Sequence, residues 1–168
     1  TAGALIASIT ANKDATVSML IAGADSSTES IGKLIVASAK LDITAMGNII
    51  AAAGTVNSDV IGKAIAFSAK EDATVVGKLL IAALTVDVDS VANVLIAAGK
   101  VDVESIGNAY LAIISESSST ALILLLKTAE IDVKVIGEIF AAAAVRALVD
   151  HSGGVTIGDF IVEAAIVD

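Results

Sequence analysis

The sequence predicts an all-α protein, an α-solenoid of 15-residue units, each a single helix, that pair into antiparallel hairpins of 30 residues. Small polar residues recur at strict 15-residue intervals along most of the chain, and the segments between them are rich in Ala and bulky apolar residues. Asp, Asn and Ser accept hydrogen bonds from the free N–H groups of a helix's first turn, and Ala-rich segments have high helix propensity. We therefore expect one short helix in each interval.

Nine positions form the periodic series, and each is expected to cap one helix. The residue before a cap is often apolar, as in Leu41 and Val56, and so is the residue four positions after it. Such a pair is typical of a hydrophobic staple, which sets how the chain enters a helix. Because Gly favours helix ends, Gly54 and Gly99 predict helices of about 12 residues followed by a two-residue link. The expected caps are Asn12, Ser27, Asp42, Asn57, Asp72, Asp87, Asp102, Ser117 and Asp132.

The expected helices follow one another along the chain without a linker. A first, incomplete helix covers residues 1–11, and complete units then begin at each cap in turn. The register breaks at about residues 137–154, where a longer helix and additional residues interrupt the 15-residue spacing, and it resumes after Gly153 and Gly154. We expect a single repeat domain over residues 1–168.

Each unit shows three kinds of surface when its residues are placed around a helix axis. A narrow polar stripe faces solvent and contains pairs such as Glu29 with Lys33, which have the favourable i,i+4 order. A broad apolar face lies opposite, and the flanks carry small residues such as Gly62 and Ala97. Gly inside a helix costs up to about 1 kcal/mol relative to Ala. We therefore expect neighbouring helices to approach one another closely along these flanks.

A β-solenoid with 15-residue coils is the alternative fold, because β-helical coils also place Asn, Asp and Gly at their corners. The strands of such a coil alternate inward and outward side chains. Residues 32–40 and 137–145 do not alternate in this way, and they favour the helical interpretation.

Composition excludes several classes of protein. A chain of 168 residues with 56% hydrophobic content buries a core, which argues against disorder. A net charge of −9 argues against binding to nucleic acid, whose phosphates require clustered Lys and Arg. The mean hydropathy of +0.90 is high, but charged residues interrupt every stretch of the roughly 18 apolar residues that a membrane span needs. Because the chain begins with Thr1 rather than Met, we expect a processed, extracellular or cell-surface protein.

No set of residues indicates an enzyme, and we expect no catalytic residue, metal site or cofactor. His151 is the only imidazole and lacks partners for metal or nucleophilic chemistry. Asp87 and Asp89 lack the Gly and the distal Glu of a calcium loop, so helix capping explains them better. If hairpins stack, four caps form an open row that binds divalent cations only weakly. This row consists of Asp42, Asp72, Asp102 and Asp132.

We expect a structural protein that self-assembles head-to-tail into filaments or a surface layer, so that its main partner is a second copy. Solenoids normally carry terminal repeats with a polar outer face, whereas both ends of this chain are apolar. The ninth residue after several caps predicts a second, lateral apolar strip. A monomeric binding scaffold for a lipid, an apolar peptide or another surface is the alternative. The expected assembly residues are Leu5, Ile6, Phe160 and Ile161 at the ends and Ile81, Ile96, Leu111 and Leu126 in the strip.

Overall fold

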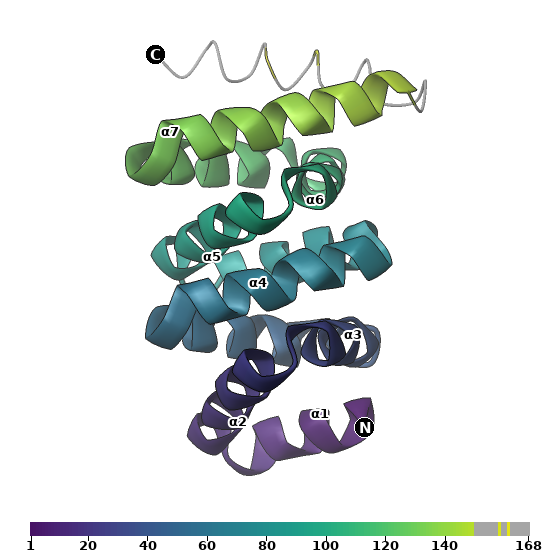
Figure 1. Ribbon diagram of the computed structural model, residues 1–168, viewed down its shortest axis with the longest axis vertical. Helices are drawn as coiled ribbons and strands as arrows, with labels where there is room; N and C mark the ends of the chain where they lie inside the picture. Colours follow the sequence, from purple (N-terminus) through teal and green to yellow (C-terminus); the bar gives the residue numbers. More distant parts are fainter. Residues whose placement is uncertain (150–157, 159–160, 162–168) are drawn as a thin grey trace.

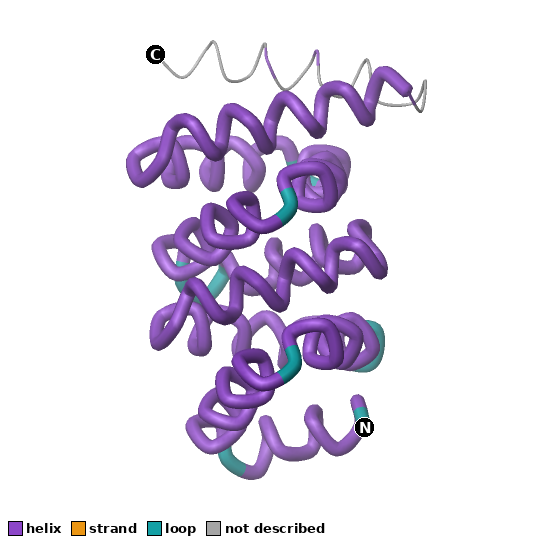
Figure 2. Tube along the Cα trace, viewed as in Figure 1, coloured by secondary structure: helices purple, strands orange, loops and turns teal. Residues whose placement is uncertain are grey.

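The computed structural model describes residues 1–149, 158 and 161, and this part of the chain is helical apart from short connections (Figure 2). It contains seven helices packed against each other and no strand, so the predicted all-α class is confirmed and the β-solenoid alternative is wrong. The helices are α1 (Ala2–Ala11), α2 (Lys13–Ser26), α3 (Thr28–Ala39), α4 (Ile43–Leu84), α5 (Val88–Val101), α6 (Val103–Glu116) and α7 (Ser118–Val149).

The helices are arranged in chain order along the long axis of the molecule, with α1 and α2 at one end and α7 at the other (Figure 1). The first three helices pack on one another and on α4, which also contacts α5 and α6. At the far end α7 packs on α5 and α6. Each helix thus buries its apolar face against helices near it in sequence, and the buried side chains form one continuous cluster from Leu5 to Ala147.

The two longest helices are interrupted by residues with extended backbone. Asn57 and Asp72 divide α4, and Asp132 divides α7, with φ values of −154°, −160° and −153°. By length and composition α4 is apolar enough to cross a membrane, but 56% of the 18-residue window in question is buried within the protein. Such burial is typical of a core helix. Beyond Asp132, α7 continues without interruption to Val149, and the rest of the predicted register break lies outside the described residues.

The connections are shorter than the sequence predicts. Three-residue connections occur only at residues 40–42 and 85–87, and elsewhere the helix continues up to the cap. At Ser27, for example, the backbone N–H still donates to the carbonyl of Gly23 at 2.8 Å, as it would within a helix. A single extended residue therefore ends one helix and begins the next. The one-residue connections between helices are Asn12, Ser27, Asp102 and Ser117.

The apolar residues that precede the caps lie on the surface, where the sequence predicts staples. Leu41 is 63% exposed and Val56 is 70% exposed. Val86, Val101 and Ile131 are each about half exposed. Because these side chains lie at the junctions between helices, the apolar core does not cover them.

Polar groups inside the core are all satisfied. Among the described residues, every buried side-chain nitrogen or oxygen has a hydrogen-bond partner. The hydroxyl of Tyr110, which is fully buried, donates to the carbonyl of Ala121 at 2.7 Å and so joins α6 to α7. Burial raises the pKa of Tyr110 above its usual range, because the interior disfavours the phenolate.

Candidate assembly surfaces

The nine periodic Asp, Asn and Ser residues all stand between helical segments, with φ between −150° and −160°. In eight of them a side-chain oxygen accepts a hydrogen bond from the backbone N–H three residues later, over 2.9 to 3.3 Å. Ser27 differs, because its hydroxyl donates to the hydroxyl of Ser30. Each backbone bond satisfies one N–H group that a helix start leaves free, so these residues define where the segments begin.

Three of these caps also pair with lysines of earlier helices. In each pair the lysine precedes the carboxylate by 32 residues. At the same separation, the hydroxyl of Thr55 donates to Asp87 over 3.3 Å. Each contact joins the end of one segment to the cap that follows the second segment after it. The ion pairs are Lys40 with Asp72 at 2.8 Å, Lys70 with Asp102 at 3.0 Å, and Lys100 with Asp132 at 3.2 Å.

Hydrogen bonds lower the pKa of all three paired carboxyl groups. For Asp72 the largest contribution comes from Lys40. For Asp102 burial acts most strongly and in the opposite direction, but the bonds from Ser105 and the paired lysine together outweigh it. For Asp132 the backbone N–H that it caps contributes most, followed by its lysine. The three carboxylates are thus held in the ionised form.

The predicted open row of acidic caps is therefore occupied by ammonium groups at three of its four positions. Within the described residues, no group of three or more His, Cys, Asp or Glu side chains is arranged to hold a metal ion. His151 lies outside the described residues. The caps of this row act in the structure as helix starts and as links between helices.

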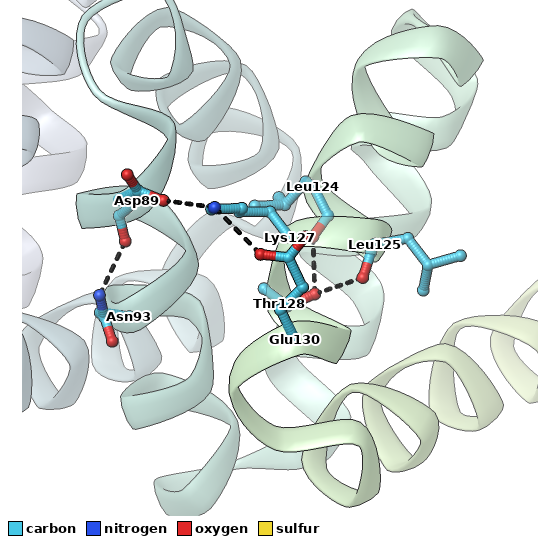
Figure 3. Close-up of polar contacts among 7 residues, drawn as sticks. All are labelled: Asp89, Asn93, Leu124, Leu125, Lys127, Thr128 and Glu130. Atoms are coloured by element: carbon cyan, nitrogen blue, oxygen red, sulfur yellow. Dashed lines mark hydrogen bonds and ion pairs between the residues drawn. The ribbon is translucent and has the colours of Figure 1, made fainter.

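Another group of polar contacts joins α5 to α7 (Figure 3). The ammonium of Lys127 lies 2.9 Å from a carboxylate oxygen of Asp89 and 3.0 Å from one of Glu130. The hydrogen bond with Asp89 contributes most to raising the pKa of Lys127. The side chain of Asn93 donates to the carbonyl of Asp89 at 2.9 Å. This part of the polar surface holds two helices together.

Glycines on the helix flanks lie against alanines of later helices. A Cβ atom placed on Gly62 would lie 2.4 Å from the Cβ of Ala97 and 2.8 Å from the backbone nitrogen of Ala98, closer than such atoms pack. The alanine follows its glycine by 35 residues in each of four contacts. A Cβ on the glycine would lie 2.7 Å from the alanine Cβ in Gly47–Ala82, 2.4 Å in Gly62–Ala97, 2.8 Å in Gly77–Ala112 and 2.6 Å in Gly107–Ala142.

Some glycines and alanines near the two ends of the described chain lack this contact. Among the described residues, nothing lies within 4 Å of a Cβ placed on Gly137 in α7 or on Gly158, and both glycines are exposed. Near the start of the chain, Ala7 in α1 and Ala22 in α2 are exposed.

The predicted end residues differ in exposure. Leu5 is only 9% exposed and belongs to the buried cluster, and Ile6 packs against that cluster as a half-buried residue. Ile161 is 52% exposed, whereas Phe160 lies outside the described residues. Leu5 is thus held mainly by contacts within its own chain.

The structure does not place the predicted lateral residues in one exposed strip. Ile96 is 5% exposed, while Ile81 and Leu111 are half-buried. The equivalent Ala51 is 1% exposed, so the ninth residue after a cap lies on a flank that other helices cover. Leu126, in α7, is 49% exposed.

Helices near both ends of the described chain expose apolar residues. On α7 the spacing i, i+4, i+8, i+11 places four exposed residues, Gly137, Ala141, Val145 and Leu148, on one face, which also carries the exposed Lys134. Val145 is 61% exposed and Leu148 is 69% exposed. Exposed helix faces are normally polar or charged.

The exposed surface of α2 mixes uncharged and charged residues. Ala15, Ser18, Ala22 and Met19, which is 56% exposed, lie beside the exposed Asp14 and Asp25. Sequence reasoning missed Met19, because most other segments bury the seventh residue after the cap. Val145 stands thirteen residues after its cap, at a position that the other segments expose, and an apolar residue there was the available signal. These two faces are the candidate functional surfaces.

Comparisons of the chain with protein-family models, curated proteins and solved structures give no match.

Proposed function

We propose that the chain is an α-solenoid of 15-residue units and acts as a non-enzymatic structural protein that self-assembles head-to-tail. The glycine–alanine contacts at a separation of 35 residues and the lysine–aspartate pairs at 32 residues support the solenoid. Both separations are constant along the chain because each unit packs on the second unit after it, and the end of each unit reaches the cap that follows that second unit. Stacked repeats in which each unit contacts only its neighbours have this property.

Self-assembly is supported by one observation above the others, the apolar side chains exposed on helices near both ends of the described chain. Terminal repeats of a solenoid normally turn a polar face outward, which keeps the ends soluble and separate. Here Val145, Leu148 and Met19 are all more than half exposed at those ends. Contact between the two different ends is heterologous, and a heterologous contact that does not close produces a filament. The product is a linear polymer or a layer of such polymers.

Sedimentation velocity over a concentration series, together with electron microscopy of the purified chain, tests this proposal. We expect assemblies that lengthen with concentration, with an axial repeat close to the length of one subunit along its stack. A chain that sediments as a monomer at the highest attainable concentration would contradict the proposal.

A monomeric binding scaffold is the second candidate, and one groove favours it. Ala4, Leu5, Met19, Leu20 and Ile31 line part of an open, mainly apolar groove of about 260 Å³ between the first helices. Such a groove fits a small apolar ligand or the side chains of an apolar peptide. A monomer that yields a stoichiometric apolar compound on solvent extraction and mass spectrometry would favour this candidate over assembly.

A further inference from the structure

We propose that residues 26–102 form a salt-sensitive hinge, in which ion pairs hold helices together at one end only and ionic strength sets the angle between them. The hinge runs from the end of α2 to the cap of α6, and its helices follow one another along the long axis of the molecule (Figure 1). It depends on contacts within one chain, so it stands whether or not copies of the chain assemble.

The ion pairs of this part of the chain form a ladder along every second junction between helical segments. Lys70 and Asp72 stand two residues apart and pair with different partners, so they connect one pair to the next. Each acidic partner is a cap or lies beside one. Among residues 1–102, the ion pairs between different segments are Lys33 with Glu71 at 3.9 Å, Lys40 with Asp72 at 2.8 Å, and Lys70 with Asp102 at 3.0 Å.

The opposite ends of the same segments are joined differently. Residues 43–56, for example, begin at the ladder after Asp42 and end at Asn57. At about 1.5 Å per residue, this far end lies about 20 Å from the ladder. There the neutral hydroxyl of Thr55 donates to Asp87 over 3.3 Å. The ion pairs near this end have partners beyond residue 102, and they are Lys78 with Glu116 and Lys127 with Asp89.

Close backbone contacts between the two ends provide a pivot. Gly47 stands five residues after its cap and Ala82 ten residues after its own, so their contact lies near the middle of both segments. A Cβ on Gly47 would lie 2.7 Å from the Cβ of Ala82, so small residues alone meet there. Crossing angles at helix contacts vary by about 15–20°. The segments can therefore change their angle about this point while the core stays packed.

Salt acts on the ladder and not on the pivot. The side chains of Lys40 and Lys70 are 54% and 52% exposed, so mobile ions reach them. The distance over which charges act falls from about 10 Å at 0.1 M salt to about 3 Å at 1 M. The contact of Gly47 with Ala82 involves no charge. High salt therefore loosens one end of the helices, and the segments separate at that end.

Two pairs of spin labels measure the two ends separately. The sequence has no Cys, so introduced cysteines are the sole attachment sites. Leu41→Cys with Val101→Cys reports on the ladder, and Ser26→Cys with Val86→Cys reports on the opposite end. Each of these residues is exposed, stands immediately before a cap and lies 60 positions from its partner. Double electron–electron resonance on labelled chain diluted with unlabelled chain gives distances within single molecules.

We expect the distance between positions 41 and 101 to lengthen as salt rises from about 0.1 M to about 1 M. The distance between positions 26 and 86 is expected to stay the same or shorten. Lys40→Gln with Lys70→Gln removes two pairs of the ladder and keeps the caps. This double variant is expected to show the longer 41–101 distance already at low salt, with no further response.

Lys13→Gln with Lys63→Gln is the matched control, because it removes the same charge from two exposed lysines that form no ion pair among the described residues. It is expected to respond to salt like the unmodified chain. The hinge is overturned if the 41–101 distance ignores salt, if both distances lengthen equally, if the Lys40, Lys70 variant keeps the salt response, or if the control loses it.

Discussion

Gly62 shows how a single residue sets the distance between two helices. A methyl group at this position would meet the Cβ of Ala97 and the backbone of Ala98, neither of which has a flexible side chain to move aside. We expect Gly62→Ala to lower the free energy of unfolding by about 1–3 kcal/mol, the usual cost of overpacking, although Ala has the higher helix propensity.

Gly137 provides the matched control for this prediction. Because no described residue lies within 4 Å of a Cβ at its position, Gly137→Ala is expected to raise the free energy of unfolding by up to about 1 kcal/mol through helix propensity alone. Urea titrations followed by circular dichroism in dilute solution measure both changes. Effects of the same sign for Gly62→Ala and Gly137→Ala would contradict the close contact.

At the scale of the helix, the caps both begin a segment and join it to an earlier one. Asp102 accepts from the backbone N–H of Ser105 at 3.0 Å and pairs with Lys70 at 3.0 Å, with only 16% of its side chain exposed. Asp102→Ala removes both interactions and is expected to cost about 1–2 kcal/mol of stability. Asp102→Asn keeps the acceptor and is expected to cost less than about 1 kcal/mol, because Lys70 is half exposed.

The pH dependence of stability reports the contribution of the ionised caps, from the ion pair and the cap bond together. The folded-state pKa values of Asp72 and Asp102 lie below the ordinary value of about 3.9, so their contribution is present above that pH and is lost as the pH falls below it. We expect the melting temperature of the unmodified chain to fall more steeply below about pH 4 than that of an Asp72→Asn, Asp102→Asn double variant. If the melting temperatures of the two chains fall equally as the pH is lowered, the ionised carboxylates contribute nothing to stability.

At the scale of the whole molecule, the proposed solenoid consists of equivalent units. We therefore expect the fold to tolerate the deletion of two of them. Deletion of residues 57–86 removes two units and brings Lys40 into register with Asp102, and Gly47 into register with Ala112. We expect this shortened chain to keep its helix content per residue and to unfold in one cooperative transition of lower free energy. Circular dichroism and urea titration measure both properties.

An out-of-register deletion is the control for this prediction. Removal of residues 57–79 ends partway through a unit, so the residues that should pair with Lys40 and Gly47 across the junction no longer stand 32 and 35 residues after them. This variant is expected to lose its cooperative transition. Equal tolerance, or equal loss of structure, in the two deletions would contradict the solenoid, because only a repeated packing distinguishes them.

The sequence by itself determined the helical class and the starts of the helical segments. A cap is a bond between residues three apart, such as Asp72 and Val75, so a short stretch of sequence contains both partners. The i,i+4 ion pair of Glu29 with Lys33, at 2.7 Å, is local in the same way. These features needed no knowledge of how the helices pack.

Only the tertiary structure decided which residues meet across helices and which remain on the surface. It paired Lys40 with Asp72, buried Ile96, and left Leu126 exposed although the two stand at equivalent positions. It also reduced the connection at Ser27 to one residue. The physical reason is that burial depends on the orientation of neighbouring helices and on whether a further helix follows, and residues more than 30 positions apart set both.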